Sequence, residues 1–196
     1  MKFLKYAFLL ILFITVYYSN IFAVENKKIN VEKEENNSIY SGLKFRSIGP
    51  ALMSGRISDI VIHPENENLW YITAGSGGVW KTENSGTTWK SIFDDQKSYS
   101  IGCISLDPQN PNIIWVGTGE NVGGRHVAYG DGIYKSEDSG KSWKNMGLKT
   151  SEHISKIIIH PKNSNIIWVA AQGPLWSKGG ERGVYKSTDG GESWTK

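Results

Sequence analysis

The hydrophobic pattern of the chain predicts short β-strands. Apolar stretches, largely β-branched, recur at residues 57–62, 101–106 and 154–159, and a polar turn containing a proline follows each one. A second strand with an aromatic residue, a loop, a third strand and a tight turn ending in tryptophan come next each time. No segment shows the 3.6-residue period of an amphipathic helix. Short strands separated by turn residues are typical of an all-β protein.

This pattern occurs three times. The copies lie at residues 57–89, 101–143 and 154–194. Four short antiparallel strands in roughly 50 residues make one blade of a β-propeller. The nearly continuous apolar first strand suits the innermost position of a blade, where both faces are buried. We therefore expect an all-β fold, a β-propeller of four-stranded antiparallel blades. About three blades are expected in residues 42–196, so the ring is incomplete.

Each copy ends in a turn with the pattern Ser/Thr-x-Asp/Asn-x-Gly-x-x-Trp. These closing turns read TENSGTTW (82–89), SEDSGKSW (136–143) and STDGGESW (187–194). The Asp or Asn can accept backbone N–H bonds, the Gly can take a positive φ, and the Trp covers the hairpin with a large apolar surface. We assign a structural role to the residues that fill the pattern: Thr82, Asn84, Gly86, Trp89, Ser136, Asp138, Gly140, Trp143, Ser187, Asp189, Gly191 and Trp194.

The closing-turn pattern resembles the Asp-box, also called the bacterial neuraminidase repeat. The resemblance covers residues 57–196 and implies a β-propeller. It leaves the activity open, because Asp-boxes occur in sialidases, xyloglucanase-type glycoside hydrolases and the sortilin receptor domain. Residues 43–56 resemble the start of large exported bacterial proteins with sortilin-like propellers. Because propellers need about four to eight blades and only three are predicted, we expect an N-terminal fragment of a longer protein or a partial gene model.

The second closing turn contains Gly140-Lys141-Ser142, which invites comparison with a phosphate-binding loop. That loop needs a glycine five residues before Gly140 and a helix after the serine. The sequence has Lys135 at the first place and no helix start at the second. The carboxylate spacing of an EF-hand is also absent. We expect no metal site and no cofactor.

The N-terminus has the layout of a secretory signal peptide. Lys2 and Lys5 precede an apolar run at residues 6–18, and residues 1–23 end in a small residue. A retained membrane anchor is the alternative, although the run is shorter than the roughly 20 residues of a spanning helix. Residues 24–41 are charged and asparagine-rich, as in a flexible spacer. We expect an exported protein that is periplasmic, cell-surface or extracellular, with no membrane span after cleavage.

Charge and cysteine content give no support for nucleic-acid binding or for an intramolecular disulfide. The net charge of +3 includes both signal-peptide lysines, so the mature chain is close to neutral and composition does not favour nucleic-acid binding. A single cysteine, Cys103, cannot form an intramolecular disulfide. Its apolar neighbours indicate a packing role rather than a reactive thiol.

Loop lengths point to one face of the propeller as the binding face. The loops between second and third strands, at 119–132 and 171–183, are longer than their counterpart in the first copy. We call the side of the blades that carries these loops the variable face. Rigid scaffolds usually carry function in loops that vary in this way. The innermost strands also begin there, at Arg56, Ser100 and His153. Candidate ligand-binding residues on this face are Arg56, Arg125, His126, Tyr129, His153, Trp176 and Arg182. His63 and His160 lie in the proline turns and are expected to be turn residues.

Two function classes remain open. Three arginines, at 56, 125 and 182, could clamp a carboxylate as in sialidases, or could be solvated loop residues. In the xyloglucanase family one catalytic carboxylate comes from a Thr-Asp-x-Gly-Gly stretch, and its slot here is Gly75. We assign no catalytic residue. The leading hypothesis is a non-catalytic module that binds protein, peptide or glycan; the alternative is a xyloglucanase-like or sialidase-like glycoside hydrolase whose carboxylates lie mostly outside this segment.

Overall fold

The computed structural model describes residues 56–121 and 127–196, which contain eleven β-strands. The expected signal peptide, the spacer, and the candidate residues Arg125 and His126 lie outside this part. The strands are β1 (Ile57–His63), β2 (Asn66–Ala74), β3 (Gly78–Thr82), β4 (Lys90–Ser91), β5 (Ile101–Leu106), β6 (Ile114–Thr118), β7 (Ile133–Ser136), β8 (Lys144–Asn145), β9 (Ile154–His160), β10 (Asn163–Ala171) and β11 (Gly183–Ser187).

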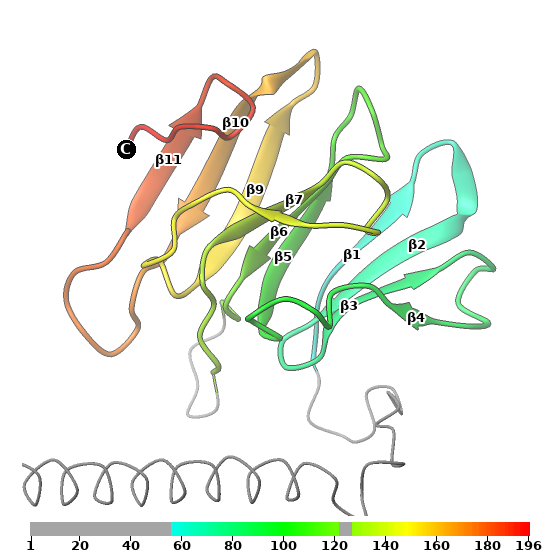
Figure 1. The fold of residues 1–196 in the computed structure, drawn as a ribbon, viewed down its shortest axis with the longest axis horizontal. Helices are drawn as coiled ribbons and strands as arrows, with labels where there is room; N and C mark the ends of the chain where they lie inside the picture. Colours follow the sequence, from blue (N-terminus) through cyan, green and yellow to red (C-terminus); the bar gives the residue numbers. More distant parts are fainter. Residues whose placement is uncertain (1–55, 122–126) are drawn as a thin grey trace, which may run out of the picture. The chain divides into compact units, whose positions relative to one another are not determined.

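The strands form three antiparallel sheets, which confirms the predicted fold class. Blade 1 has the order β1-β2-β3-β4, blade 2 the order β5-β6-β7-β8, and blade 3 the order β9-β10-β11 (Figure 1). In blade 3 the fourth strand is reduced to one bridge, between Lys186 and Thr195. Within the described residues the three blades lie side by side, with β5 in contact with both β1 and β9.

The strand register corrects one step of the repeat alignment. By sequence Trp70 matches the tryptophans of the other second strands, Trp115 and Trp168. In the structure Lys135 pairs with Trp115 and Lys186 with Trp168, whereas the equivalent Lys81 pairs with Tyr71. Each lysine ammonium also lies over the ring of its partner, at 5.5 to 5.9 Å. Tyr71 therefore replaces tryptophan in blade 1, because strand alternation buries only one of the two adjacent aromatic residues.

Two apolar clusters hold neighbouring blades together. Between blades 1 and 2, Phe93 meets Tyr134 and Trp143 edge to face, at centroid distances of 5.2 and 5.0 Å. Between blades 2 and 3, the cluster includes Trp115 and Cys103, which is 1% exposed. Burial raises the pKa of the Cys103 thiol to about 12, so this cysteine packs as an apolar residue and is unreactive at neutral pH.

The closing turns are tied together by their own side chains. In the second turn, the Asp138 carboxylate accepts the N–H groups of Lys141 and Ser142, both at 2.9 Å. In the third turn, Asp189 accepts the N–H of Ser193 at 3.0 Å. In the first turn, the side-chain oxygen of Asn84 accepts the N–H of Thr88 at 2.8 Å. Hydrogen bonds to the ionised form lower the pKa of both aspartates to about 2.

The same turns also connect the blades. The indole N–H of Trp143 donates to the carbonyl of Ile92 in blade 1, at 2.7 Å. The indole N–H of Trp194 donates to the carbonyl of Met146 in blade 2, also at 2.7 Å. Ile92 and Met146 each lie three residues after the tryptophan of their own blade. Trp143 and Trp194 therefore each fasten their blade to the preceding one.

Candidate functional site

Three side chains occupy equivalent positions where the innermost strands begin on the variable face. The carbonyls of Arg56, Ser100 and His153 each accept a hydrogen bond from the residue after the second strand of the same blade. The donors are Gly75, Gly119 and Gln172, at 2.8, 2.7 and 2.8 Å. This repeated bond places an arginine, a serine and a histidine side by side along three blades.

A partly buried ion pair crosses from blade 1 to blade 2 at this point. Arg56 donates to the carboxylate of Glu120 through Nε, at 2.6 Å to Oε1, and through Nη2 to Oε2. The Glu120 side chain is 1% exposed, whereas that of Arg56 is 52% exposed. The hydrogen bonds and charge of Glu120 raise the pKa of Arg56. The carboxylate thus fixes a guanidinium whose outer half faces solvent.

Glu120 is held in place through its backbone. Its N–H donates to Ser100 Oγ at 3.0 Å, and this hydroxyl donates to the carbonyl of Ala128 at 2.8 Å. Its carbonyl accepts a hydrogen bond from Nδ1 of His153 at 2.7 Å. One residue of blade 2 therefore connects the starts of all three innermost strands.

His153 is fully buried and is fixed in one tautomer. Because a carbonyl can only accept, Nδ1 carries the proton and Nε2 is the unprotonated nitrogen. No other residue of the described part bonds Nε2. Burial lowers the pKa of His153, so the ring is neutral at pH 7. The ring of Tyr129, 57% exposed, lies edge-on to it at 5.6 Å. We call Arg56, Ser100, Glu120, Tyr129 and His153 the mouth site.

The carboxylate of Glu120 fills the space beside Gly75. Gly75 stands where the Thr-Asp-x-Gly-Gly stretch has its aspartate. A Cβ placed on Gly75 would lie 2.6 Å from the carboxyl carbon of Glu120. An aspartate at position 75 and the observed Glu120 are therefore sterically incompatible. Sequence reasoning missed Glu120, and the only signal for it was an acidic residue shortly after the second strand of blade 2.

The loop at 171–183 contains two candidate residues, Arg182 and Trp176, in different environments. Arg182 donates through Nη2 to the carbonyls of Pro174 and Ser177, so its guanidinium braces the loop. Trp176 is 68% exposed and lines a shallow hollow with Lys178 and Arg182. Among the described residues Arg56 and Arg182 share no hydrogen-bond partner.

The turn histidines act within their turns. Nδ1 of His63 accepts the N–H of Glu65 at 3.2 Å, and Nδ1 of His160 accepts the N–H of Lys162 at 3.1 Å. In residues 56–121 and 127–196 no group of three or more His, Cys, Asp or Glu side chains is placed to hold a metal ion. Nor does this part of the chain contain a helix long and apolar enough to cross a membrane.

Fold and site together define the chain as part of a β-propeller with a polar site where its innermost strands begin. It is 25% identical over 156 residues to a xyloglucanase of Hypocrea jecorina (strain QM6a), and 26% identical over 155 residues to a xyloglucanase of Acetivibrio thermocellus (strain ATCC 27405). Each match covers 72% of this chain and 18% of the relative, so the chain spans less than a fifth of these proteins. No family model matches the chain.

Solved structures show the same fold. An ancestral GH74 enzyme superposes with a TM-score of 0.55 at 22% identity, over 71% of this chain and 18% of that one. The GH74 enzyme of Niastella koreensis gives a TM-score of 0.51 at 24% identity, over 69% and 20%. The chain is thus a partial β-propeller, similar in sequence to one segment of xyloglucanases.

Proposed function

We propose that this chain is a glycan-binding segment of an exported β-propeller and that the mouth site contacts the glycan. The supporting observation is the half-exposed Arg56, which the buried carboxylate of Glu120 holds in place, in a site whose His153 also packs against the exposed ring of Tyr129. A site with a fixed donor group and an exposed aromatic ring suits a sugar, which offers hydroxyl oxygens and a flat apolar face. The similarity to xyloglucanases favours a glycan over the protein or peptide ligands that the sequence also allows.

The hydrogen-bonding capacity of Arg56 defines what can bind. A guanidinium has five N–H donors, and Glu120 takes two of them along the Nε edge. The edge formed by Nη1 and Nη2 is left for ligand oxygens. Because Glu120 neutralises the charge of Arg56, the pair suits hydroxyl-rich neutral sugars.

The binding role is favoured over catalysis by the contacts of Glu120. A catalytic acid or base must reach the proton that it transfers. Glu120 instead accepts two hydrogen bonds from a guanidinium and is shielded from solvent. The alternative function is a glycoside hydrolase of the xyloglucanase type, in which Glu120 positions Arg56 and the reacting carboxylates come from outside the described residues. The sequence similarity to xyloglucanases supports this alternative.

Calorimetric titration of the full-length protein with xyloglucan oligosaccharides tests the proposal. Replacing Arg56 with alanine removes one or two charged hydrogen bonds and should weaken binding roughly tenfold to a hundredfold. Lys162→Ala, in the proline turn of blade 3 at the other end of the strands, is the matched control and should bind as the parent does. Binding of no glycan, or binding unaffected by Arg56→Ala, would refute the proposed role. Measurable hydrolysis of xyloglucan would favour the alternative.

A further inference from the structure

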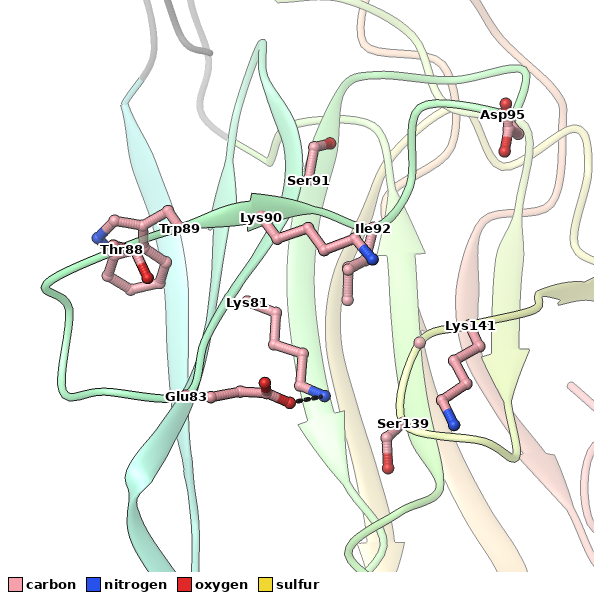
Figure 2. Close-up of a pocket in the computed structure, with 11 residues that line it drawn as sticks. Lys81, Glu83, Thr88, Trp89, Lys90, Ser91, Ile92, Asp95, Ser139 and Lys141 are labelled. Atoms are coloured by element: carbon pink, nitrogen blue, oxygen red, sulfur yellow. Dashed lines mark ion pairs between the residues drawn. The ribbon is translucent and has the colours of Figure 1, made fainter. Parts of the chain in front are cut away.

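A second polar groove lies between the closing turns of blades 1 and 2, at the opposite end of the strands from the mouth site. It has a volume of about 490 Å³. Lys81, Lys90 and Ile92 of blade 1 form one wall, and Ser139 and Lys141 of blade 2 form the other (Figure 2). Lys141 is the lysine of the Gly-Lys-Ser sequence, which has no part in the structural pattern of the turn.

The charges of this groove are only partly compensated, because its three lysines face two acids, Glu83 and Asp95. Lys81 pairs with Glu83 at 2.7 Å, as the dashed line in Figure 2 shows. Lys90 and Lys141 are exposed and form no ion pair with any residue in the described ranges. Lys81 lowers the pKa of Glu83, and the charges of Lys90 and Lys141 lower it further. The charges of Lys90 and Lys141 therefore both act on Glu83, which lines the groove.

The next pair of blades provides an internal comparison. The equivalent groove between blades 2 and 3, of about 300 Å³, keeps the first ion pair as Lys135 with Glu137, at 2.6 Å. There, Lys144 also pairs with Glu192, at 3.0 Å. Lys144 is the counterpart of Lys90, and Glu192 is the counterpart of Lys141. Glu192, which pairs with a lysine in the groove between blades 2 and 3, is thus replaced by Lys141 in the groove between blades 1 and 2.

This replacement leaves the first groove with an excess of positive charge that the second lacks. Two ammonium groups on facing walls repel each other, and an anion between them removes the repulsion and gains two attractive interactions. We propose that the groove between blades 1 and 2 binds an anionic glycan, whose carboxylate or sulfate group lies between Lys90 and Lys141. This site is separate from the mouth site and does not depend on its function.

A glycan fits this groove better than an acidic peptide does. An extended peptide gains affinity by adding a strand to a sheet edge, and β4 at this edge has only two residues. A glycan needs only its charged group between the two ammonium groups, so the short edge strand does not limit its binding.

Two reciprocal charge changes test the inference on the full-length protein at low salt. The probes are a sulfated hexasaccharide and an oligogalacturonate, which distinguish sulfate from carboxylate recognition, with hexaglutamate as the peptide probe. Lys141→Glu makes the first groove resemble the second and should weaken glycan binding roughly tenfold. Glu192→Lys makes the second groove resemble the first and should raise the stoichiometry from one site to two. Both positions are exposed in their turns, so the melting temperature should stay unchanged.

Binding of at least one acidic glycan that weakens with Lys141→Glu and with added salt supports the site. If Lys141→Glu is poorly folded, Lys90→Gln with Lys141→Gln removes both charges and should give the same loss. Affinity unchanged by these variants, no binding of either acidic glycan, or tighter binding of hexaglutamate would overturn the inference. Arg56→Ala should leave this binding intact, so failure here is distinguishable from failure of the mouth site.

Discussion

At the residue scale, Glu120 and Gly75 depend on each other although they belong to neighbouring blades. The carboxyl group of Glu120 lies where a side chain at position 75 would begin. Replacing Gly75 with alanine should therefore displace Glu120 and its bond to Arg56. We expect Gly75→Ala to destabilise the protein by about 1–3 kcal/mol, measured by chemical denaturation.

The Glu120→Ala background supplies the control for this prediction. Without the carboxylate, the added methyl group has room, and Gly75→Ala should have little further effect. Equal destabilisation by Gly75→Ala in both backgrounds would show that the two residues are not coupled.

His153 should make stability depend on pH. Its pKa is lowered in the folded state, chiefly by burial, whereas the unfolded chain has the ordinary histidine value near 6.5. The unfolded state therefore binds more protons in acid, and stability that is fully present above pH 6.5 is lost as the pH falls towards the folded pKa. His153→Asn retains an N–H donor for the carbonyl of Glu120 and should flatten the stability curve between pH 7.5 and 5. An unchanged slope would exclude His153 as its origin.

At the element scale, the closing tryptophans should contribute to stability through their indole N–H groups. Trp143→Phe keeps most of the apolar surface but leaves the Ile92 carbonyl without its donor. We expect a loss of about 1 kcal/mol in the free energy of unfolding. Trp89→Phe is the matched control, since no hydrogen bond joins the Trp89 indole to another described residue. Equal losses in both variants would contradict a role for the bond between blades.

The elements were predictable because they repeat. Three copies of apolar strand, proline turn and closing turn define the all-β fold and the number of blades present, and the structure confirms the fold. Trp70 shows the limit of this reasoning. Two adjacent aromatic residues fit the pattern equally well, and only cross-strand pairing shows that Tyr71 is the buried equivalent of Trp115.

The mouth site was only partly predictable, for a physical reason. Arg56 and His153 could be placed by counting back from the turn prolines, because the spacing between these positions and the prolines is the same in all three copies. Glu120 could not be paired with Arg56, because the two residues come from different blades and their contact depends on how the blades pack. Arg182 bonds its own loop, which local sequence does not reveal.

At the scale of the whole molecule, residues 1–23 should be removed on export. Their basic start and apolar run predict a cleaved signal peptide, so the mature protein should begin at about Val24. Mass spectrometry of the N-terminal peptide from the exported protein would show this directly. A mature chain that retains residues 1–23 would instead support a membrane anchor.

Glycan recognition at the mouth site is the central feature of the proposed function. The most direct test is an experimental structure of the full-length protein bound to a xyloglucan oligosaccharide. We predict sugar oxygens within hydrogen-bond distance of the Nη1 and Nη2 atoms of Arg56, with Glu120 still paired to its other edge. A sugar ring should lie against Tyr129. An oligosaccharide bound elsewhere, with Arg56 contacting only solvent and Glu120, would contradict the proposed site.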